Sequence, residues 1–259
     1  MSNYLNEHGV SQALKSIISV AVVYFLLAEL SAQVLSFTNF TQTLSLNSGF
    51  ALAAMLTMAH LRVLTGILLG AISLNLYPLF ESGWLTSDVL LPLLIPAFMV
   101  VIQASIGLKI YRKWVSDDNS LSHDNDLLRF LKVLPLIAAV NTLFSIFTSQ
   151  WLTSFTQEVF ILTWIQLWLG HVLGLILVIP VVFSLLERKN QLWQSRRHIV
   201  VISFIVSLII TSLICTNINA YENSRLEDRF KIITNQTATL FQISLKEKEL
   251  LQASVAQLI

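Results

Sequence analysis

The stretch TWIQLWLGHVLGLILVIP, residues 163–180, places two tryptophans, a glycine pair and a histidine inside an apolar run. Apolar residues continue on both sides, from about position 159 to position 186. Because a bilayer-spanning helix needs only about 20 predominantly apolar residues, this stretch predicts a membrane span. The rest of the chain is interpreted outward from it.

The composition is that of an integral membrane protein. Hydrophobic residues make up 55% of the 259 residues and charged residues only 12%, whereas soluble domains carry roughly 25% charged residues. The mean hydropathy is +0.71. The lipid bilayer is therefore the first predicted partner. The net charge of +1 and the dispersed basic residues exclude a nucleic-acid partner.

No pattern in the chain indicates catalysis. The single cysteine, Cys215, excludes an internal disulfide framework. Glycine-rich nucleotide-binding motifs are absent, and the five histidines lack the spacing of metal ligands. We therefore expect no enzymatic activity, no cofactor and no metal site in these residues.

The apolar runs predict about seven spans and an all-α, polytopic membrane helix bundle over residues 1–216. Five runs lie at residues 13–37, 89–111, 131–152, 159–186 and 199–216. The region 47–80 is too long for one span and contains His60 and Arg62. Because a guanidinium inside the bilayer is costly, we predict two short helices there, with a tight turn at residues 60–62. The polar stretch 38–48 before it is interpreted as a loop.

A second domain is predicted at residues 217–259, where the chain becomes charged. Its apolar positions recur largely in steps of three and four, as in a long amphipathic helix with polar breaks at Thr237, Ser244 and Glu247. These positions are Leu226, Phe230, Ile233, Leu240, Leu251, Val255 and Leu258. No glycine, asparagine or proline terminates the pattern before Ile259. We therefore expect the chain to be the first part of a longer protein.

Basic residues orient the bundle. With seven spans, all the basic residues before position 217 fall on one side: Lys15, Arg62, Lys109, Arg112, Lys113, Arg129, Lys132, Arg188, Lys189, Arg196 and Arg197. The opposite loops, at about 38–48, 81–88 and 153–158, contain no lysine or arginine. The positive-inside rule then predicts a cytoplasmic amino terminus and an extracytoplasmic segment 217–259.

Two blocks of the sequence resemble a known family. Residues 47–75, NSGFALAAMLTMAHLRVLTGILLGAISLN, are similar to the early block of the first type of membrane-associated sensor (MASE) domain. Residues 163–180 resemble its second block, through Trp164, Trp168, Leu169, Gly170, Gly174 and Pro180. The likeness covers roughly residues 15–215. His171 stands where the family pattern has an acidic residue, and the tryptophan and proline of that pattern near residues 61–65 are absent.

The resemblance implies a function and a location. Such domains stand at the front of bacterial sensor histidine kinases of two-component systems and of diguanylate cyclases, which make cyclic di-GMP. The tail from Glu222 is similar to the opening helix of a CHASE domain, an extracytoplasmic ligand-sensing module. The resemblance thus implies a multi-pass protein of the bacterial inner membrane, with a small ligand of unknown identity and output domains outside this chain.

Three polar residues inside predicted spans are candidates for sensing a ligand or signal, since ionisable groups in a bilayer are functional hypotheses by default. Glu29 lies in the first span and His171 near the centre of the span 159–186. Each is either functional or a neutral, hydrogen-bonded packing residue, and a pair between them is one hypothesis. Asn141 lies in the middle of the span 131–152.

Trp164 and Trp168 are one helical turn apart and share a face. An interfacial aromatic belt or stacking on a ligand would each explain them. Gly170 and Gly174 form a G-x-x-x-G motif, as do Gly66 and Gly70. Such glycines allow close helix contact, either within one chain or between the chains of a homodimer.

Two functional classes and a structural one remain open on this evidence. A receptor module would sense a signal in the membrane and pass it to output domains by helix displacement. A small-molecule transporter or channel would line a pathway with the same buried polar residues, although no convincing inverted repeat supports it. A passive membrane anchor and dimerisation module is the third reading.

Overall fold

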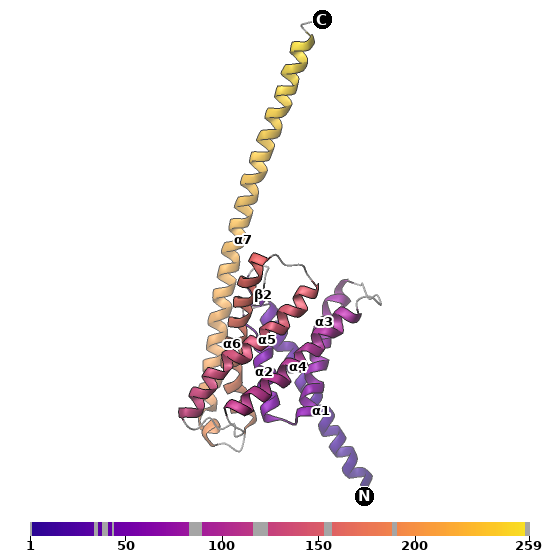
Figure 1. Cartoon of the computed structure of the whole chain (residues 1–259), viewed down its shortest axis with the longest axis vertical. Coiled ribbons are helices and arrows are strands. Elements are labelled where there is room, and N and C mark those ends of the chain that lie inside the picture. Colours follow the sequence, from indigo (N-terminus) through magenta and orange to yellow (C-terminus); the bar gives the residue numbers. More distant parts are fainter. Residues whose placement is uncertain are drawn as a thin grey trace. The chain divides into compact units, whose positions relative to one another are not determined.

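The computed structural model describes residues 2–33, 36–37, 41–42, 44–82, 90–115, 124–152, 157–187 and 191–256. These residues form seven α-helices and one pair of two-residue strands (Figure 1). The elements are α1 Ser2–Gln33, β1 Ser36–Phe37, β2 Thr41–Gln42, α2 Leu46–Thr57, α3 His60–Ser82, α4 Leu90–Trp114, α5 Asp124–Leu152, α6 Gln157–Leu186 and α7 Gln191–Ala256. The chain divides into two compact units, Met1–Leu213 and Ile214–Ile259.

Six of the described helices are long and apolar enough to cross a bilayer. Their mean hydropathies lie between 1.3 and 2.7 over segments of at least 18 residues, or about 27 Å of helix. The segments are Val10–Gln33, His60–Tyr77, Leu94–Trp114, Asn125–Phe147, Thr163–Leu186 and Trp193–Ile218. This finding confirms the predicted all-α polytopic membrane bundle.

The remaining helix, α2, begins inside the bundle. With 12 residues it is about 18 Å long, too short for a hydrocarbon core of about 30 Å. Leu44 and Ser45, which precede it, are only 2% and 5% exposed. The prediction of a polar loop over residues 38–48 is therefore wrong at its end, where α2 begins at residue 46. The polar groups there find partners in neighbouring helices instead of in water.

The break between α2 and α3 lies at Met58 and Ala59, before the predicted turn at residues 60–62. The Met58 N–H donates to the Ala54 carbonyl at 2.9 Å and ends α2. His60 is the first residue of α3, which has 23 residues. The chain thus forms two helices as predicted, but only the first is short. Arg62 lies exposed in the first turn of α3, so its guanidinium avoids burial without a separate turn.

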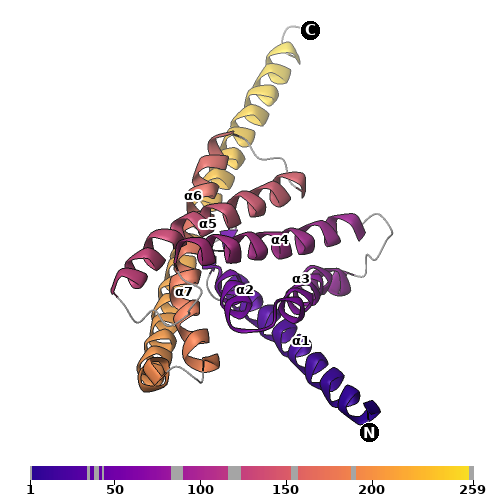
Figure 2. The same cartoon turned by 60° about the horizontal axis from the view of Figure 1, so that its bottom comes forward.

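The helix α2 is also the most enclosed element of the first unit. It contacts α1, α3, α4 and α6, which surround it in Figure 2. All but two of its twelve residues are buried. Small residues make this possible, because Gly49, Ala51, Ala53 and Ala54 let neighbouring helices approach closely.

A single helix of 66 residues, α7, covers the last predicted span and the predicted tail helix. The predicted span and the predicted amphipathic helix after residue 217 are therefore continuous in one helix. The physical reason is visible in the sequence, which contains no glycine after Gly174 and no proline after Pro180. Nothing in the backbone chemistry interrupts the helix, so the change from apolar to charged residues alters its surroundings and not its conformation.

Candidate functional site: a polar cavity inside the helix bundle

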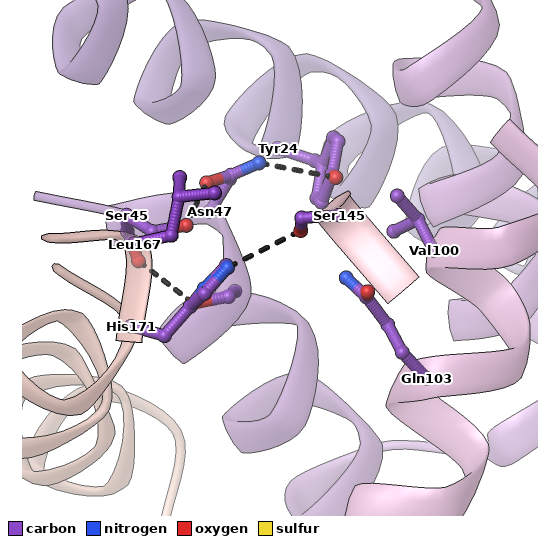
Figure 3. Close-up of a pocket in the computed structure, with 9 residues that line it drawn as sticks. Tyr24, Ser45, Asn47, Val100, Gln103, Ser145, Leu167 and His171 are labelled. Carbon is purple, nitrogen blue, oxygen red and sulfur yellow. Dashed lines mark hydrogen bonds between the residues drawn. The ribbon is translucent and has the colours of Figure 1, made fainter. Parts of the chain in front are cut away.

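A cavity of about 150 Å³ lies in the first unit where five helices meet. Hydroxyl, carboxamide and imidazole groups point into it, as Figure 3 shows. Its described lining consists of Tyr24 from α1, Ser45, Asn47 and Ser48 at the start of α2, Val100 and Gln103 from α4, Ser145 from α5, and Leu167 and His171 from α6. No aspartate, glutamate, lysine or arginine is among these residues.

His171 joins three helices across the cavity. It is 5% exposed, and its Nδ1 lies 3.2 Å from the Ser48 hydroxyl of α2. Its Nε2 lies 3.3 Å from the Ser145 hydroxyl of α5 (Figure 3). Both ring nitrogens of the imidazole are therefore hydrogen-bonded to serines of neighbouring helices.

Both serines also bond to the backbone. The Ser48 hydroxyl donates to the Ser45 carbonyl at 2.8 Å, and the Ser145 hydroxyl donates to the Asn141 carbonyl at 3.0 Å. A hydroxyl has one proton, and a neutral imidazole has one N–H donor and one acceptor. One of the two serines must therefore choose between the backbone carbonyl and the imidazole. Rotation of that serine hydroxyl moves its proton from the backbone carbonyl to the imidazole nitrogen, or back.

The backbone of α6 sets the position of His171. The Ser45 N–H donates to the Gly170 carbonyl at 3.1 Å, one residue before the histidine. One turn further along, Gly174 lies against the Ser45 carbonyl so closely that a Cβ atom would overlap it. Gly49 of α2 lies equally close to the Gly174 carbonyl. This G-x-x-x-G motif therefore holds the start of α2 against the middle of α6.

Polar contacts from α1 complete the start of α2. The Ser31 hydroxyl accepts the Leu46 N–H at 3.1 Å, although Ser45 makes no side-chain cap of its own helix. Asn47 donates from Nδ2 to the Tyr24 hydroxyl at 3.1 Å and accepts from the Ser45 hydroxyl at 3.0 Å. A helix end buried in a membrane needs such partners, since water is absent.

Two further carboxamides are buried in this part of the bundle, Gln103 in the cavity lining and Asn141 outside it. Asn141 is 4% exposed, and its Oδ1 has no hydrogen-bond partner among the described residues. Gln103 is 7% exposed, and Figure 3 shows its carboxamide directed toward the cavity. Gln103, Asn141 and Ser48 line a second space of about 10 Å³, and Asn141 lines only this second space. Its volume is close to the minimum needed for one water molecule.

The other predicted site residues lie outside the cavity. Glu29 accepts a hydrogen bond from Gln33 at 2.7 Å, and no hydrogen bond or ion pair joins it to His171 in the described part of the chain. Trp164 and Trp168 stack with centroids 6.1 Å apart. The Trp168 indole N–H donates to the Pro135 carbonyl of α5 at 3.0 Å. That indole therefore has a protein partner and does not need the headgroup region.

The second predicted glycine pair packs α3 against α1. A Cβ at Gly66 would lie 2.7 Å from Val20 Cβ, and one at Gly70 would lie 2.7 Å from the Ala21 carbonyl oxygen. Both glycine pairs thus make contacts within one chain. In each case the glycine lies against a backbone atom or a Cβ atom of a neighbouring segment.

Several cavity residues escape sequence reasoning, namely Tyr24, Ser48, Gln103 and Ser145. Serine and tyrosine are common in membrane helices, so single occurrences carry little information. Gln103 is the exception, because it is an uncharged polar residue near the middle of the segment Leu94–Trp114. The same rule that selected Asn141 would have selected it.

The contacts of His171 predict which mutations are coupled. The double mutant His171→Ala/Ser145→Ala should show an interaction energy between about 0.5 and 1.5 kcal/mol in thermal or denaturant unfolding. The pair Glu29→Ala/His171→Ala should instead be additive within about 0.5 kcal/mol, because the two residues share no partner. Additivity at Ser145, or strong coupling at Glu29, would contradict the hydrogen-bond assignment.

The buried polar site in a bundle of spans agrees with the family comparison. The model of the MASE1 family matches residues 16–221. The chain belongs to the MASE1 family. MASE1 is a membrane-associated sensor domain of signal-transduction proteins. The match includes the whole cavity and the first part of α7. No curated protein and no solved structure matches the chain.

Proposed function

We propose that this MASE1 domain is the receptor module of a bacterial signal-transduction protein, and that the polar cavity is its ligand site. The observation that carries the proposal is the meeting of five helices at one buried, uncharged, hydrogen-bonding cavity. A packing core has no need for a cavity lined by polar side chains, because burying such groups costs stability. A binding site does need open hydrogen-bonding groups.

Signal transfer would begin at His171. A ligand in the cavity lies against the imidazole, Ser48 and Ser145, and so disturbs the contacts that hold α6 to α2 and α5. Such a ligand binds two arrangements of α6 unequally, which is the requirement for shifting a conformational equilibrium. The helix α7 follows α6 after a short connection, and the T-shaped contact of Phe183 with Trp193 links the two at 5.7 Å. As one unbroken helix, α7 is suited to carry a displacement.

Orientation, output and tail belong to the same proposal. By the positive-inside rule, the end of the bundle that carries Arg62, Arg112 and Lys113 faces the cytoplasm of a bacterial inner membrane. The residues after position 217 are then extracytoplasmic and would begin a CHASE-like module. A histidine kinase or a diguanylate cyclase would provide the output. The amphipathic pattern of the tail supports this arrangement, because it predicts a helix outside the membrane.

A homodimer through the tail is the proposed assembly. Positions 226, 230, 233, 237, 240, 244, 247 and 251 follow each other in alternating steps of four and three. This is the heptad spacing of a coiled coil. Leu226, Phe230, Ile233 and Leu240 are 50–72% exposed within the single chain. Thr237, Ser244 and Glu247 occupy the same stripe, so they are polar layers and not interruptions of the register.

The receptor proposal is tested by asking whether the cavity controls α7. Spin labels on Ser73→Cys of α3 and Thr239→Cys of α7, in a Cys215→Ser background, report a distance in lipid nanodiscs after dilution with unlabelled protein. We expect Ser48→Ala and Ser145→Ala to shift the distance distribution, because each removes a bond that holds α6.

The matched control is Ser105→Ala. Ser105 donates to the Val101 carbonyl at 2.8 Å, as Ser145 does to that of Asn141, but it does not line the cavity. Its substitution should leave the distribution unchanged. A distribution that is the same in every variant would refute the receptor proposal and leave the passive anchor. Uptake of a solute by proteoliposomes containing this chain would instead establish the transporter.

A further inference from the structure

We propose that the cavity binds one small uncharged molecule with a hydrogen-bond donor and an acceptor side by side, the pattern of a lactam or simple amide. This inference rests on the receptor proposal and specifies its ligand. It follows from three properties of the cavity, which are its size, its lack of charge, and the identity of the polar groups that remain open.

Size limits the ligand to one ring or less. The cavity measures about 150 Å³, and an engineered protein cavity of about that volume is known to hold benzene. Larger molecules such as sugars with phosphate groups or peptides do not fit without separating the five helices. A molecule of roughly five to eight non-hydrogen atoms matches the space.

The lining disfavours an ion. None of its described residues is acidic or carries a permanent positive charge. Glu29, the carboxylate in the first span, accepts a hydrogen bond from Gln33 and does not line the cavity. An ion in a low-dielectric interior costs several kcal/mol unless an opposite charge pairs with it. An uncharged ligand avoids this cost.

The open groups determine the hydrogen-bonding pattern. Ser45, Asn47 and Ser48 already bond to one another, to the backbone, or to Tyr24 and His171. The Gln103 carboxamide also lines the cavity, and no hydrogen bond joins it to the other residues drawn in Figure 3. A carboxamide presents an N–H donor and a carbonyl acceptor side by side. Its best complement is another amide, which returns both hydrogen bonds at once.

An apolar molecule of the same size is a poorer occupant. Benzene would fill the volume but would leave the Gln103 carboxamide without a partner. A buried polar group without a partner costs about 1–3 kcal/mol, which corresponds to a factor of roughly 5 to 150 in affinity. The cavity should therefore discriminate against apolar ligands by hydrogen bonding and against ions by desolvation.

The test uses the lactam 2-pyridone as the probe on the complete chain in nanodiscs. Binding is followed by calorimetry. We expect saturable binding of one molecule, at least about tenfold tighter than that of benzene, N-methylpyridinium or N-methyl-2-pyridone. Benzene lacks polar groups, N-methylpyridinium carries a positive charge, and N-methyl-2-pyridone lacks the N–H donor.

Two variants keep the result independent of folding. Gln103→Met preserves side-chain volume and removes the open amide of the cavity. We expect it to weaken 2-pyridone binding at least about tenfold. Asn141→Leu removes an amide that lines only the second space, so it should raise Tm by eliminating a buried acceptor without a partner, and it should leave binding within about twofold of the parent chain. Ser105→Ala should leave binding unchanged. Unchanged binding by folded Gln103→Met protein would overturn the proposal.

The outcomes separate this inference from the receptor proposal. Failure of 2-pyridone to bind at millimolar concentration, or equal binding of benzene, overturns the ligand class. The receptor proposal survives that result if the cavity variants still shift the spin-label distance on α7. Binding of 2-pyridone without any shift in that distance supports the ligand class and counts against the receptor.

Discussion

Among glycine-to-alanine substitutions, Gly174→Ala is expected to lower the stability of the bundle most. The added Cβ would overlap the Ser45 carbonyl oxygen, which belongs to the backbone and cannot rotate away. Relief requires α2 to move off α6, which breaks the bond from the Ser45 N–H to the Gly170 carbonyl. Overpacking of about 1–3 kcal/mol and the lost hydrogen bond together give about 3 kcal/mol or more of destabilisation.

Thermal unfolding of the purified protein in nanodiscs measures this effect. Gly49→Ala, on the other side of the contact, should act in the same direction, since its Cβ would overlap the Gly174 carbonyl. Gly107→Ala is the matched control. Its Cβ would meet only the ends of the Ile137 and Leu52 side chains, at 3.2 and 3.6 Å, and those can shift. Equal stability of the Gly174→Ala and Gly107→Ala proteins would contradict the contact between α2 and α6.

Cysteines placed along the tail of α7 are expected to form disulfides between two chains at heptad positions alone. In a Cys215→Ser background, Phe230→Cys, Ile233→Cys and Thr237→Cys should cross-link to near completion under mild oxidation. These positions face the partner in the proposed coiled coil, where paired Cβ atoms come within disulfide range. Non-reducing electrophoresis of membranes measures the fraction of dimer.

The controls are Asp228→Cys and Asn235→Cys, which lie on the opposite face of the heptad. They should remain largely monomeric. Position 235 is only two residues from 233 and 237, so differences in exposure or depth do not explain a contrast between them. Uniform cross-linking along the tail would indicate random collision, and absence of cross-linking everywhere would remove the homodimer through this helix.

Much of the architecture follows from the sequence because the signals are local. Apolar runs of bilayer length identify five of the six spans, and the interruption at His60 and Arg62 indicates a helix boundary within two or three residues of its place. The G-x-x-x-G pairs indicate close helix contacts. The position of His171 marks it as worth testing, and the structure gives it hydrogen bonds to two neighbouring helices.

The prediction of a loop before α2 is wrong because hydropathy does not show the tertiary partners of polar groups. The stretch before α2 contains Ser45, Asn47 and Ser48 and is therefore polar enough to be interpreted as a loop. Its polarity is satisfied by Tyr24, Ser31 and Gly170, residues far away in the sequence. Hydropathy sums residues along the chain and contains no information about such partners.

The sequence by itself determined that the chain is a helical membrane protein, where its long helices lie, and to which family it belongs. Those properties depend on apolar length and on motifs within single segments. Only the tertiary structure decided that a half-length helix enters the bundle and that Gln103, Ser145 and His171 surround one cavity. Which polar side chains meet depends on the rotation and depth of each helix, and these are set by backbone contacts such as that of Gly174 with Ser45.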